Sequence, residues 1–447
     1  MIKTKRLLVL TVPFMALGTM LSLTGCSKKY DLVIYNWEDY IFEGDDDKEG
    51  TVKAFEKFYS EKVGRKIKVD YETFSTNEDM YQQIKLDSIH PDLICPSDYM
   101  IQKMANDGML EPFSYNEETK SYGESLANWD KYGSPFIRNK FANEKLNDGS
   151  SFLKYAVPYF WGTMGFTYDA DYFGPTGDGK NIDITSWECL WSADPAAVDV
   201  FTLKDSVRDS YVAAIFHVYK AEIEELTTNH FNDPDYNEKL SAIFNRCDSD
   251  TITKVEAALK AAFDTTVKGL EVDEGKTDIV TGTIKANLAW SGDSVFSMDS
   301  AEGKKQLNYS LPTVGSNVWF DGWCMPKGAR TDIAEAFVDF ISTPANAADC
   351  MDAVGYTSPI VGQEMWDLVN DWYSADDGVV ADDVDLSFYF GDSIDEPAII
   401  SVPHEERGRQ FDAQYPTEEV LKKCCVMKDF GENQEAVDAM WIRVYTE

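Results

Sequence analysis

The sequence predicts an α/β protein, because segments with the pattern of strands alternate with segments with the pattern of helices from residue 31 onward. Residues 31–35 (DLVIY) form a continuous apolar run, which is typical of a strand buried on both faces. Apolar residues then recur at helical spacing from Val52 to Val63, and Gly64 is the expected stop. Residues 66–74 (KIKVDYETF) alternate between apolar and polar side chains, as a second strand does. This order predicts a parallel sheet with right-handed crossovers.

The segments after the second strand continue the alternation. Ser75 and Glu78 have the spacing of a capping box and predict a helix over 75–84. Residues 91–100 (PDLICPSDYM) predict a third strand that runs into a loop. Helices are expected near 206–226, 235–246 and 253–268, and extended segments at 283–295 and 316–326. We expect the acidic stretch from 351 to 417 to be an irregular surface insertion, with a final helix after Pro416.

Large aromatic and acidic side chains follow the predicted strands. In a parallel α/β sheet, ligands bind at the carboxyl ends of the strands, and Trp37, Ser97 and Tyr99 lie just past such ends. In the extended segment 316–326, residues two apart share a face, so Trp319, Asp321 and Trp323 are expected on one side. Trp323 has an alternative place in the core beneath a hinge.

The composition narrows the function. The chain has 447 residues and 44% hydrophobic content, enough for about two or three domain-sized units. Lys and Arg total 41 against 78 for Asp and Glu, a net charge of −37. Such a field repels nucleic acids and anionic lipid headgroups and attracts small cations. We therefore expect no nucleic-acid partner.

The N-terminus has the features of an export signal. Lys3, Lys5 and Arg6 precede an apolar run over 7–23, which ends in the residues LTGC at Cys26. A Cys after Leu-Thr-Gly resembles the bacterial lipoprotein box, in which that thiol is acylated and becomes the mature N-terminus. We expect residues 1–25 to be the signal peptide and Cys26 to anchor an extracytoplasmic protein by lipid, the only membrane contact. The alternative is an uncleaved anchor, although the run is marginal for the ~20 residues of a spanning helix.

Signatures of catalysis and of cofactor binding are missing from the sequence. It has no G-x-S-x-G, P-loop, H-E-x-x-H or Gly-rich dinucleotide turn, and its acidic runs lack the spacing of a calcium loop. We expect no catalytic residue, no metal and no cofactor. A hydrolase with two separated carboxylates leaves no local trace in a sequence, so a glycan-active hydrolase stays the enzymatic alternative.

Aromatic rings and carboxylates at strand ends favour a ligand with ammonium groups. Each ammonium gains about 0.5–2 kcal/mol over an indole or phenol face, depending on desolvation. A buried ammonium also needs a carboxylate to offset its lost hydration. A slot with aromatic walls and a few acids would therefore select an elongated organic polycation and reject sodium, which has no methylenes to pack.

Eight segments of the sequence carry a resemblance to a known family. They are YNWEDY, MYQQIKLDSIHPDLICPSDYMIQKM, VPYFWGTMGFTYD, SWECLW, DSVRDS, WSGDSV, VWFDGWCMP and VGYTSP. In this order they resemble the spermidine/putrescine-binding proteins of ATP-binding-cassette (ABC) importers. The resemblance runs from about Leu32 to the C-terminal helix and weakens across 362–413, where this chain looks longer.

The resemblance implies a two-lobed fold of the periplasmic-binding-protein type (type II), with a mixed sheet flanked by helices in each lobe and the ligand in the cleft between them. Lobe 1 is expected at 31–157 plus 321–357, and lobe 2 at 158–320 plus 358–447, with 362–413 as an acidic insertion. Closure of the lobes on a polyamine would present the complex to the permease and ATPase. We expect a monomer.

The resemblance also implies the ligand-binding residues, which are Trp37, Tyr40, Ser97, Tyr99, Asp209, Trp290, Trp319 and Asp321. Two positions depart from the pattern, because Ser206 stands where a second acid is expected and Met427 where a glutamine is expected. Losing an acid could shorten the preferred ligand towards putrescine, unless Asp205 or Asp293 compensates. Trp161 is either hinge packing or cleft wall.

The sequence thus predicts an extracytoplasmic binding lipoprotein that captures putrescine or spermidine, delivers it to an ABC importer and catalyses nothing. Another cation in the same fold, such as thiamine, a quaternary amine or chelated iron, is the first alternative. A sensor or adhesin that keeps the cleft is a further one.

Overall fold

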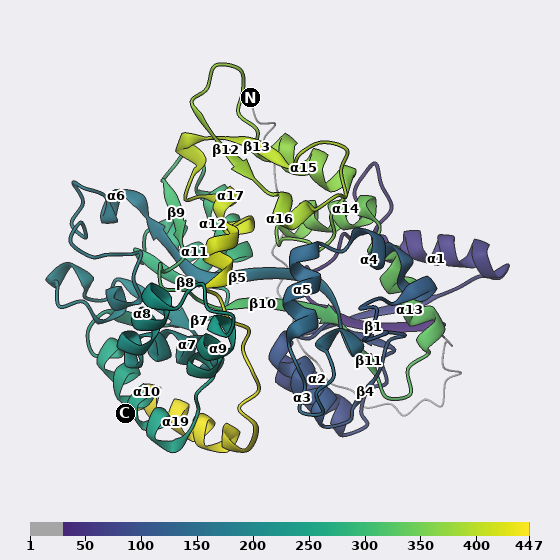
Figure 1. Ribbon diagram of the computed structural model, residues 1–447, viewed down its shortest axis with the longest axis horizontal. Coiled ribbons are helices and arrows are strands. Elements are labelled where there is room, and N and C mark those ends of the chain that lie inside the picture. Colours follow the sequence, from purple (N-terminus) through teal and green to yellow (C-terminus); the bar gives the residue numbers. More distant parts are fainter. Residues whose placement is uncertain (1–29, 447) are drawn as a thin grey trace, which may run out of the picture.

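The computed structural model describes residues 30–446 (Figure 1). The predicted signal peptide 1–25 and the predicted anchor Cys26 lie outside the described residues. Among the helices of 30–446, none combines the length and the apolarity that crossing a membrane requires. The described chain forms two lobes, each built on its own sheet.

The first lobe is built on a small parallel sheet with the strand order β2-β1-β3. Its elements are β1 (Leu32–Trp37), α1 (Thr51–Val63), β2 (Val69–Phe74), α2 (Asn77–Lys85), β3 (Leu93–Ile94), α3 (Asp98–Asn106), β4 (Leu110–Glu111), α4 (Ala127–Tyr132) and α5 (Pro135–Asn143). The predicted alternation of strand and helix is confirmed. Gly64 ends α1 with a φ of 70°, a conformation that favours glycine.

One predicted cap is wrong by a residue. The N-cap of α2 is Thr76, whose side chain accepts a hydrogen bond from the amide of Asp79. The sequence offers two adjacent hydroxyl residues here, and Ser75 was the one that completed a capping box with Glu78. A hydroxyl at either position can satisfy a free amide of the first turn, so the backbone path decides between them.

The second lobe is built on a mixed sheet with the order β10-β5-β8-β6-β7, and β9 also pairs with β5. Its strands are β5 (Val157–Asp169), β6 (Phe201–Lys204), β7 (Val267–Glu271), β8 (Ala286–Trp290), β9 (Leu307–Ser310) and β10 (Val318–Trp323). Its helices are α6 (Ala170–Phe173), α7 (Val207–Val218), α8 (Lys220–Asn229), α9 (Tyr236–Phe244), α10 (Ser249–Phe263), α11 (Gly275–Thr281) and α12 (Ser291–Ala301).

Two antiparallel strands, β5 and β10, connect the lobes (Figure 1). The register of this pair shifts between Asp321 and Gly322. Beyond the shift, the backbone of Cys324 exchanges two hydrogen bonds with Ile94 of β3, at 3.0 and 2.8 Å. The chain that leaves the second sheet therefore adds an antiparallel neighbour to the first, which makes both sheets mixed.

The C-terminal part of the chain is ordered and packed, so the expectation of irregular structure over 351–417 is wrong. Its elements, preceded by β11 (Met325–Pro326), are α13 (Thr331–Ile341), α14 (Pro344–Val354), α15 (Gln363–Tyr373), β12 (Ala381–Asp385), α16 (Ser387–Phe390), β13 (Ile399–Pro403), α17 (Gln410–Gln414), α18 (Glu418–Lys422) and α19 (Gln434–Thr446). The prediction relied on the acidic composition of this segment. Its acids, however, lie outside a set of large buried side chains, which includes Trp366, Tyr389, Phe411 and Tyr415.

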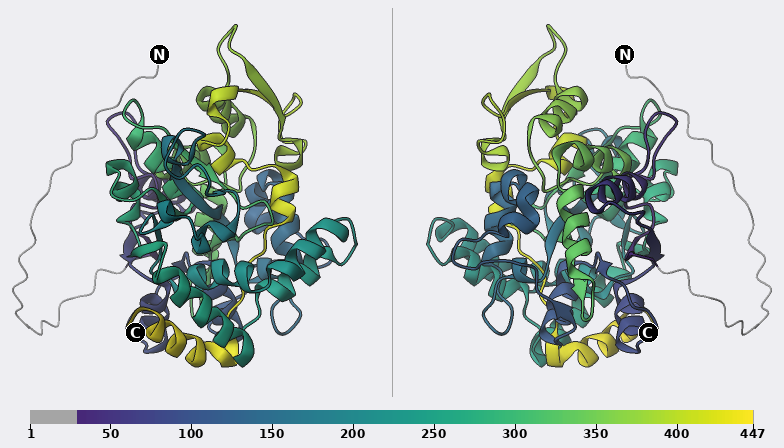
Figure 2. Two further views of the ribbon diagram at one scale, coloured as in Figure 1. Left: turned by 90° about the vertical axis from the view of Figure 1, so that its left-hand side faces the viewer. Right: turned by 90° about the vertical axis from the view of Figure 1, so that its right-hand side faces the viewer.

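Buried side chains form two main cores. The first core contains the first sheet and its helices, and it also takes in buried residues from Ile360 to Cys424. The second core lies on the six-stranded sheet and ends with residues of α19. The side views show the β12–β13 hairpin at one end of the molecule and α19 at the other (Figure 2). The predicted lobe boundaries stay a prediction, and this packing favours a place for 358–424 beside the first lobe.

Candidate ligand-binding site

The candidate site lies where strands from both lobes end. Trp37 is the last residue of β1, and Trp290 is the last residue of β8. Trp319 and Asp321 lie on β10, two residues apart and before its register shift. Because side chains alternate along a strand, these two share a face. The topology thus brings together residues that are far apart in the sequence.

Asp321 is the acid that joins the two lobes. The phenol of Tyr40 donates a hydrogen bond of 2.7 Å to its Oδ2, and Ser97 is its partner in an antiparallel backbone bridge. Within residues 30–446, its other oxygen, Oδ1, is buried without a hydrogen-bond partner. Burial raises the pKa of this carboxyl to about 6, although hydrogen bonding to the carboxylate lowers it in part.

Tyr356 links the rings of the site, and sequence analysis missed it. Its ring centroid lies 5.8 Å from that of Tyr40 and 5.4 Å from that of Trp319, both edge to face. Its hydroxyl donates a 2.8 Å hydrogen bond to Oδ1 of Asp293. It belongs to the segment VGYTSP, which carried the resemblance but follows a helix, so the rule about strand ends did not select it.

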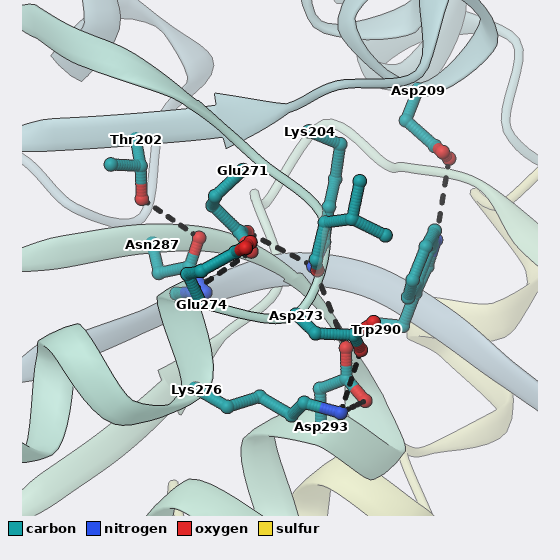
Figure 3. A network of polar contacts seen from close by, with 12 residues as sticks. Thr202, Lys204, Asp209, Glu271, Asp273, Glu274, Lys276, Asn287, Trp290 and Asp293 are labelled. Atoms are coloured by element: carbon teal, nitrogen blue, oxygen red, sulfur yellow. Dashed lines mark hydrogen bonds and ion pairs between the residues drawn. The ribbon is translucent and has the colours of Figure 1, made fainter. Parts of the chain in front are cut away.

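The second lobe contributes a further acid and ring. Nε1 of Trp290 donates to Oδ1 of Asp209 at 3.4 Å (Figure 3). Burial raises the pKa of Asp209. The hydroxyl of Ser206 caps α7 by accepting from the amide of Asp209, so the residue that replaces an expected acid has a local structural role.

Arg208 is a buried arginine beside Tyr99 of the first lobe, and sequence analysis did not select it. The guanidinium of Arg208 lies 5.6 Å from the ring centroid of Tyr99 and 3.9 Å from that of Phe430. Burial lowers the pKa of Arg208, while burial raises the pKa of Asp98 well above its usual value. The phenol of Tyr99 donates to Glu78 at 2.9 Å. A contact across the lobes therefore lies at this edge of the site.

Trp37 and Trp319, like Trp323, have a buried indole nitrogen, Nε1, that lacks a hydrogen-bond partner among the described residues. The ring of Trp37 packs on Phe74 at 4.6 Å. A buried unpaired donor costs on the order of 1–3 kcal/mol, which makes these indoles candidates for contact with a polar ligand.

Trp161, Met427 and Trp323 lie in the cores of the two lobes. Trp161 is buried in the first core and donates from Nε1 to the hydroxyl of Tyr389 at 2.8 Å. Met427 is buried in the second core. Trp323 packs on Tyr159 at 4.8 Å, the core alternative, because the register shift turns it away from Asp321.

Among residues 30–446, the structure contains no group of three or more His, Cys, Asp or Glu side chains that could hold a metal ion. What the site offers instead is aromatic faces, buried carboxylates and unpaired polar atoms. The buried carboxylates Asp209 and Asp321 present acceptors to a polar organic cation, and the aromatic faces present apolar surface to its methylenes.

Residues 51–376 match the family described as bacterial extracellular solute-binding protein. The chain belongs to this family. Members of this family bind a solute for transport, so the protein is a solute-binding protein and not an enzyme. The family is extracytoplasmic.

Curated relatives refine the comparison. The spermidine/putrescine-binding periplasmic protein of Salmonella typhimurium is 25% identical over 347 residues, which cover 77% of this chain and 82% of the relative. The putrescine-binding periplasmic protein SpuD of Pseudomonas aeruginosa is 23% identical, over 98% of this chain and 97% of its own. The resemblance predicted from the sequence is confirmed.

Solved structures agree on the fold. The spermidine/putrescine ABC transporter substrate-binding protein PotD of Streptococcus pneumoniae superposes with a TM-score of 0.60 at 23% identity, covering 93% of this chain and 98% of that one. The TpPotD lipoprotein of Treponema pallidum also gives 0.60, at 16% identity and with 93% and 99% covered. The predicted two-lobed α/β fold is confirmed.

Proposed function

We propose that this solute-binding protein captures polyamines and delivers them to an ABC importer. The observation that carries the proposal is the buried Oδ1 of Asp321, which has no hydrogen-bond partner among the described residues and lies in a cluster of aromatic rings. A carboxylate oxygen can only accept hydrogen bonds, so its natural partner is a donor that carries a positive charge.

The surrounding groups extend this preference from a cation to an alkylammonium. The faces of Tyr40, Trp319 and Tyr356 offer cation–π stabilisation of about 0.5–2 kcal/mol per contact together with apolar surface for methylenes. The unpaired indole donors at Trp37 and Trp319 cannot bind an ammonium directly, and we propose that they contact water or a polar group beside the ligand. The names of the relatives from Salmonella typhimurium and Pseudomonas aeruginosa support the polyamine class.

The proposed ligand residues come from both lobes, which supports capture by closure. Tyr40, Ser97 and Tyr99 belong to the first lobe, whereas Asp209 and Trp290 belong to the second. A ligand that contacts both sets would stabilise the closed arrangement by its differential affinity for it. The closed complex would then be what the permease and ATPase recognise. We propose that the protein acts as a monomer.

We also propose that the protein is held at the membrane by a lipid on Cys26, after removal of residues 1–25. The evidence is the basic start, the apolar run and the residues LTGC. Mass spectrometry of the N-terminal peptide from membranes of a bacterium that expresses the full chain would test it. An N-terminus that begins before Cys26, or an unmodified Cys26, would contradict the anchor.

Isothermal titration with putrescine, spermidine, glycine betaine and thiamine tests the polyamine proposal. We expect binding heat with at least one polyamine and none with glycine betaine or thiamine. Heat with one of these two and with neither polyamine would refute it. The mass of any ligand retained by the purified protein gives an independent answer, and turnover of a glycoside would favour the enzymatic alternative.

A further inference from the structure

Lys204 is a lysine buried completely inside the candidate site. Its side chain is 0% exposed, and its Nζ lies 3.0 Å from Oε1 of Glu271 and 3.5 Å from Oδ2 of Asp293. The same nitrogen donates to the carbonyl of Val272 at 2.7 Å and lies 4.3 Å from the ring centroid of Trp290 (Figure 3). The ammonium thus has three acceptors and one aromatic face.

The fold fixes this arrangement. β6 pairs in parallel with β7 and β8, so Lys204, Glu271 and Trp290, which end these strands, meet at one edge of the sheet. Lys204 and Glu271 are direct partners in the register of β6 and β7. Glu271 is held in turn by the amide of Gly275 at 2.9 Å. The position of the ammonium is therefore determined by three strand ends and not by a flexible loop.

The surroundings of Lys204 are those expected around an amine of the ligand. A lysine side chain is four methylenes that end in an ammonium, which is the same chemical group as one end of 1,4-diaminobutane. An aromatic face, two carboxylates and a carbonyl are the partners that a desolvated alkylammonium requires. In this chain, an amine that belongs to the protein already has all of them.

We propose that Lys204 permanently occupies an amine position of the ligand slot and so restricts the protein to short diamines. The inference rests on the proposed function and deepens it, because it names the ligand class within the polyamines. With the ammonium of Lys204 beside Trp290, the carboxylates of the proposed site that remain for the ligand are Asp209, which accepts from Nε1 of Trp290, and Asp321. A triamine would have to place an additional ammonium close to the Lys204 charge.

Asp293 does not restore the acid that is missing at Ser206. Its two carboxylate oxygens are contacted by Lys204 and by Lys276, whose Nζ lies 3.6 Å away (Figure 3). The hydroxyl of Tyr356 also donates a hydrogen bond to Oδ1. Asp205, the other candidate, is exposed. Glu271 and Asp293 are thus paired within the chain, which leaves Asp209 as the acid beside Trp290 and agrees with a ligand that carries fewer charges.

The competing interpretation is an ion pair that only stabilises the fold. Buried ion pairs often add little net stability, because desolvation offsets their attraction. A purely structural lysine would change unfolding when it is replaced, but it would leave the ratio of affinities for two polyamines unchanged. The ratio is therefore the decisive measurement.

The experiment compares putrescine and spermidine by isothermal titration for the wild type, K204M, K204M/E271Q and K285M. K204M removes the ammonium, and the double variant also removes one acid so that the local charge balance is kept. K285M is the matched control, because Lys285 pairs with Asp169 at 3.3 Å away from the proposed ligand residues and its loss changes the net charge equally. Circular dichroism melting reports whether each variant is folded.

We expect the wild type to bind putrescine at least tenfold more tightly than spermidine. In K204M and K204M/E271Q, this ratio should move at least tenfold towards spermidine, while in K285M it should stay within twofold. A wild type that binds spermidine as tightly as putrescine overturns the inference and leaves the proposed function intact. So does a folded Lys204 variant with an unchanged ratio. A wild type that binds neither polyamine overturns both.

Discussion

Asp321 is buried in the folded protein, so folding includes the cost of desolvating its carboxylate. Its carboxyl is 7% exposed, and its pKa rises from 3.8 to about 6. A carboxyl with a higher pKa in the folded state binds more protons there than in the unfolded chain, so its contribution to stability falls as pH rises from about 4 to 6. Above pH 6, the destabilisation is on the order of 3 kcal/mol. A ligand ammonium would offset it.

Asp321→Asn should therefore have opposite effects on stability and on binding. At pH 7.5 we expect the free energy of unfolding of the ligand-free protein to rise by about 1–3 kcal/mol, because the buried charge is gone. We expect polyamine affinity to fall more than tenfold, because the ammonium loses its carboxylate. Urea denaturation and isothermal titration measure the two effects. A change in affinity below twofold would show that this carboxylate is not at the ligand.

The raised pKa of Asp321 also determines how we expect polyamine affinity to depend on pH. The amines of a polyamine keep their protons across pH 5–7.5, whereas Asp321 gains a proton as pH falls through about 6. Affinity should thus decrease about tenfold between pH 7.5 and pH 5.0. In Asp321→Asn most of this dependence should disappear, and Asp209 would supply what is left, since its pKa is also raised. Titrations at both pH values that give equal wild-type affinities would rule the mechanism out.

At the scale of elements, the close contact between β5 and β10 positions the Trp319 ring. Gly162 of β5 is the register partner of Trp319. A Cβ at Gly162 would lie 2.7 Å from Cζ2 of Trp319 and 2.5 Å from Oγ of Ser291. Only a residue without a side chain therefore allows the indole its present position.

Gly162→Ala should displace the indole and weaken the ligand. We expect affinity to fall at least fivefold and the free energy of unfolding to fall by about 1–3 kcal/mol, as overpacking usually costs. Gly269→Ala on β7 is the control, because its Cβ would meet nothing within 4 Å. Titration and urea denaturation should find the control close to the wild type. Equal affinities for both variants would show that Trp319 does not need this position.

At the scale of the whole molecule, Tyr389 ties the C-terminal segment to a strand that connects the lobes. Its hydroxyl accepts a 2.8 Å hydrogen bond from Nε1 of Trp161 on β5 and donates to the carbonyl of Ser358. The ring lies 5.6 Å from that of Trp161. The segment that looked like an acidic insertion in the sequence thus completes the first core.

Tyr389→Phe should lower stability and leave the ligand site unaffected. It leaves the Trp161 indole N–H and the Ser358 carbonyl without their partner, which we expect to cost about 1–3 kcal/mol. Polyamine affinity should stay within twofold, because the partners of the Tyr389 hydroxyl, Trp161 and Ser358, are not proposed ligand residues. Tyr445→Phe, at a 54% exposed position, is the control and should change stability by less than about 0.5 kcal/mol. Denaturation curves that coincide for the two variants would contradict this role.

Local patterns in the sequence predicted much of the fold and part of the site. Sequence patterns predicted the apolar run of β1, the end of α1 at Gly64 and the alternation of β2, because each depends only on neighbouring residues in the chain. Trp37 and Trp290 were proposed for the site, and the structure places each at the end of a strand. Lys204 also ends a strand and follows the same rule, but a lysine did not look like part of a cation site.

The sequence by itself determined the α/β class, the family and most of the aromatic and acidic residues of the proposed site, because strand and helix periodicity and segment order are properties of the chain. Only the tertiary structure decided which of these residues meet. It turned Trp323 into the core through a register shift and brought Tyr356 between the Tyr40 and Trp319 rings. It also placed the Lys204 ammonium over Trp290. Such contacts depend on how strand ends that are distant in the sequence converge, and on which charged groups pair because both are buried. Local sequence patterns contain neither kind of information.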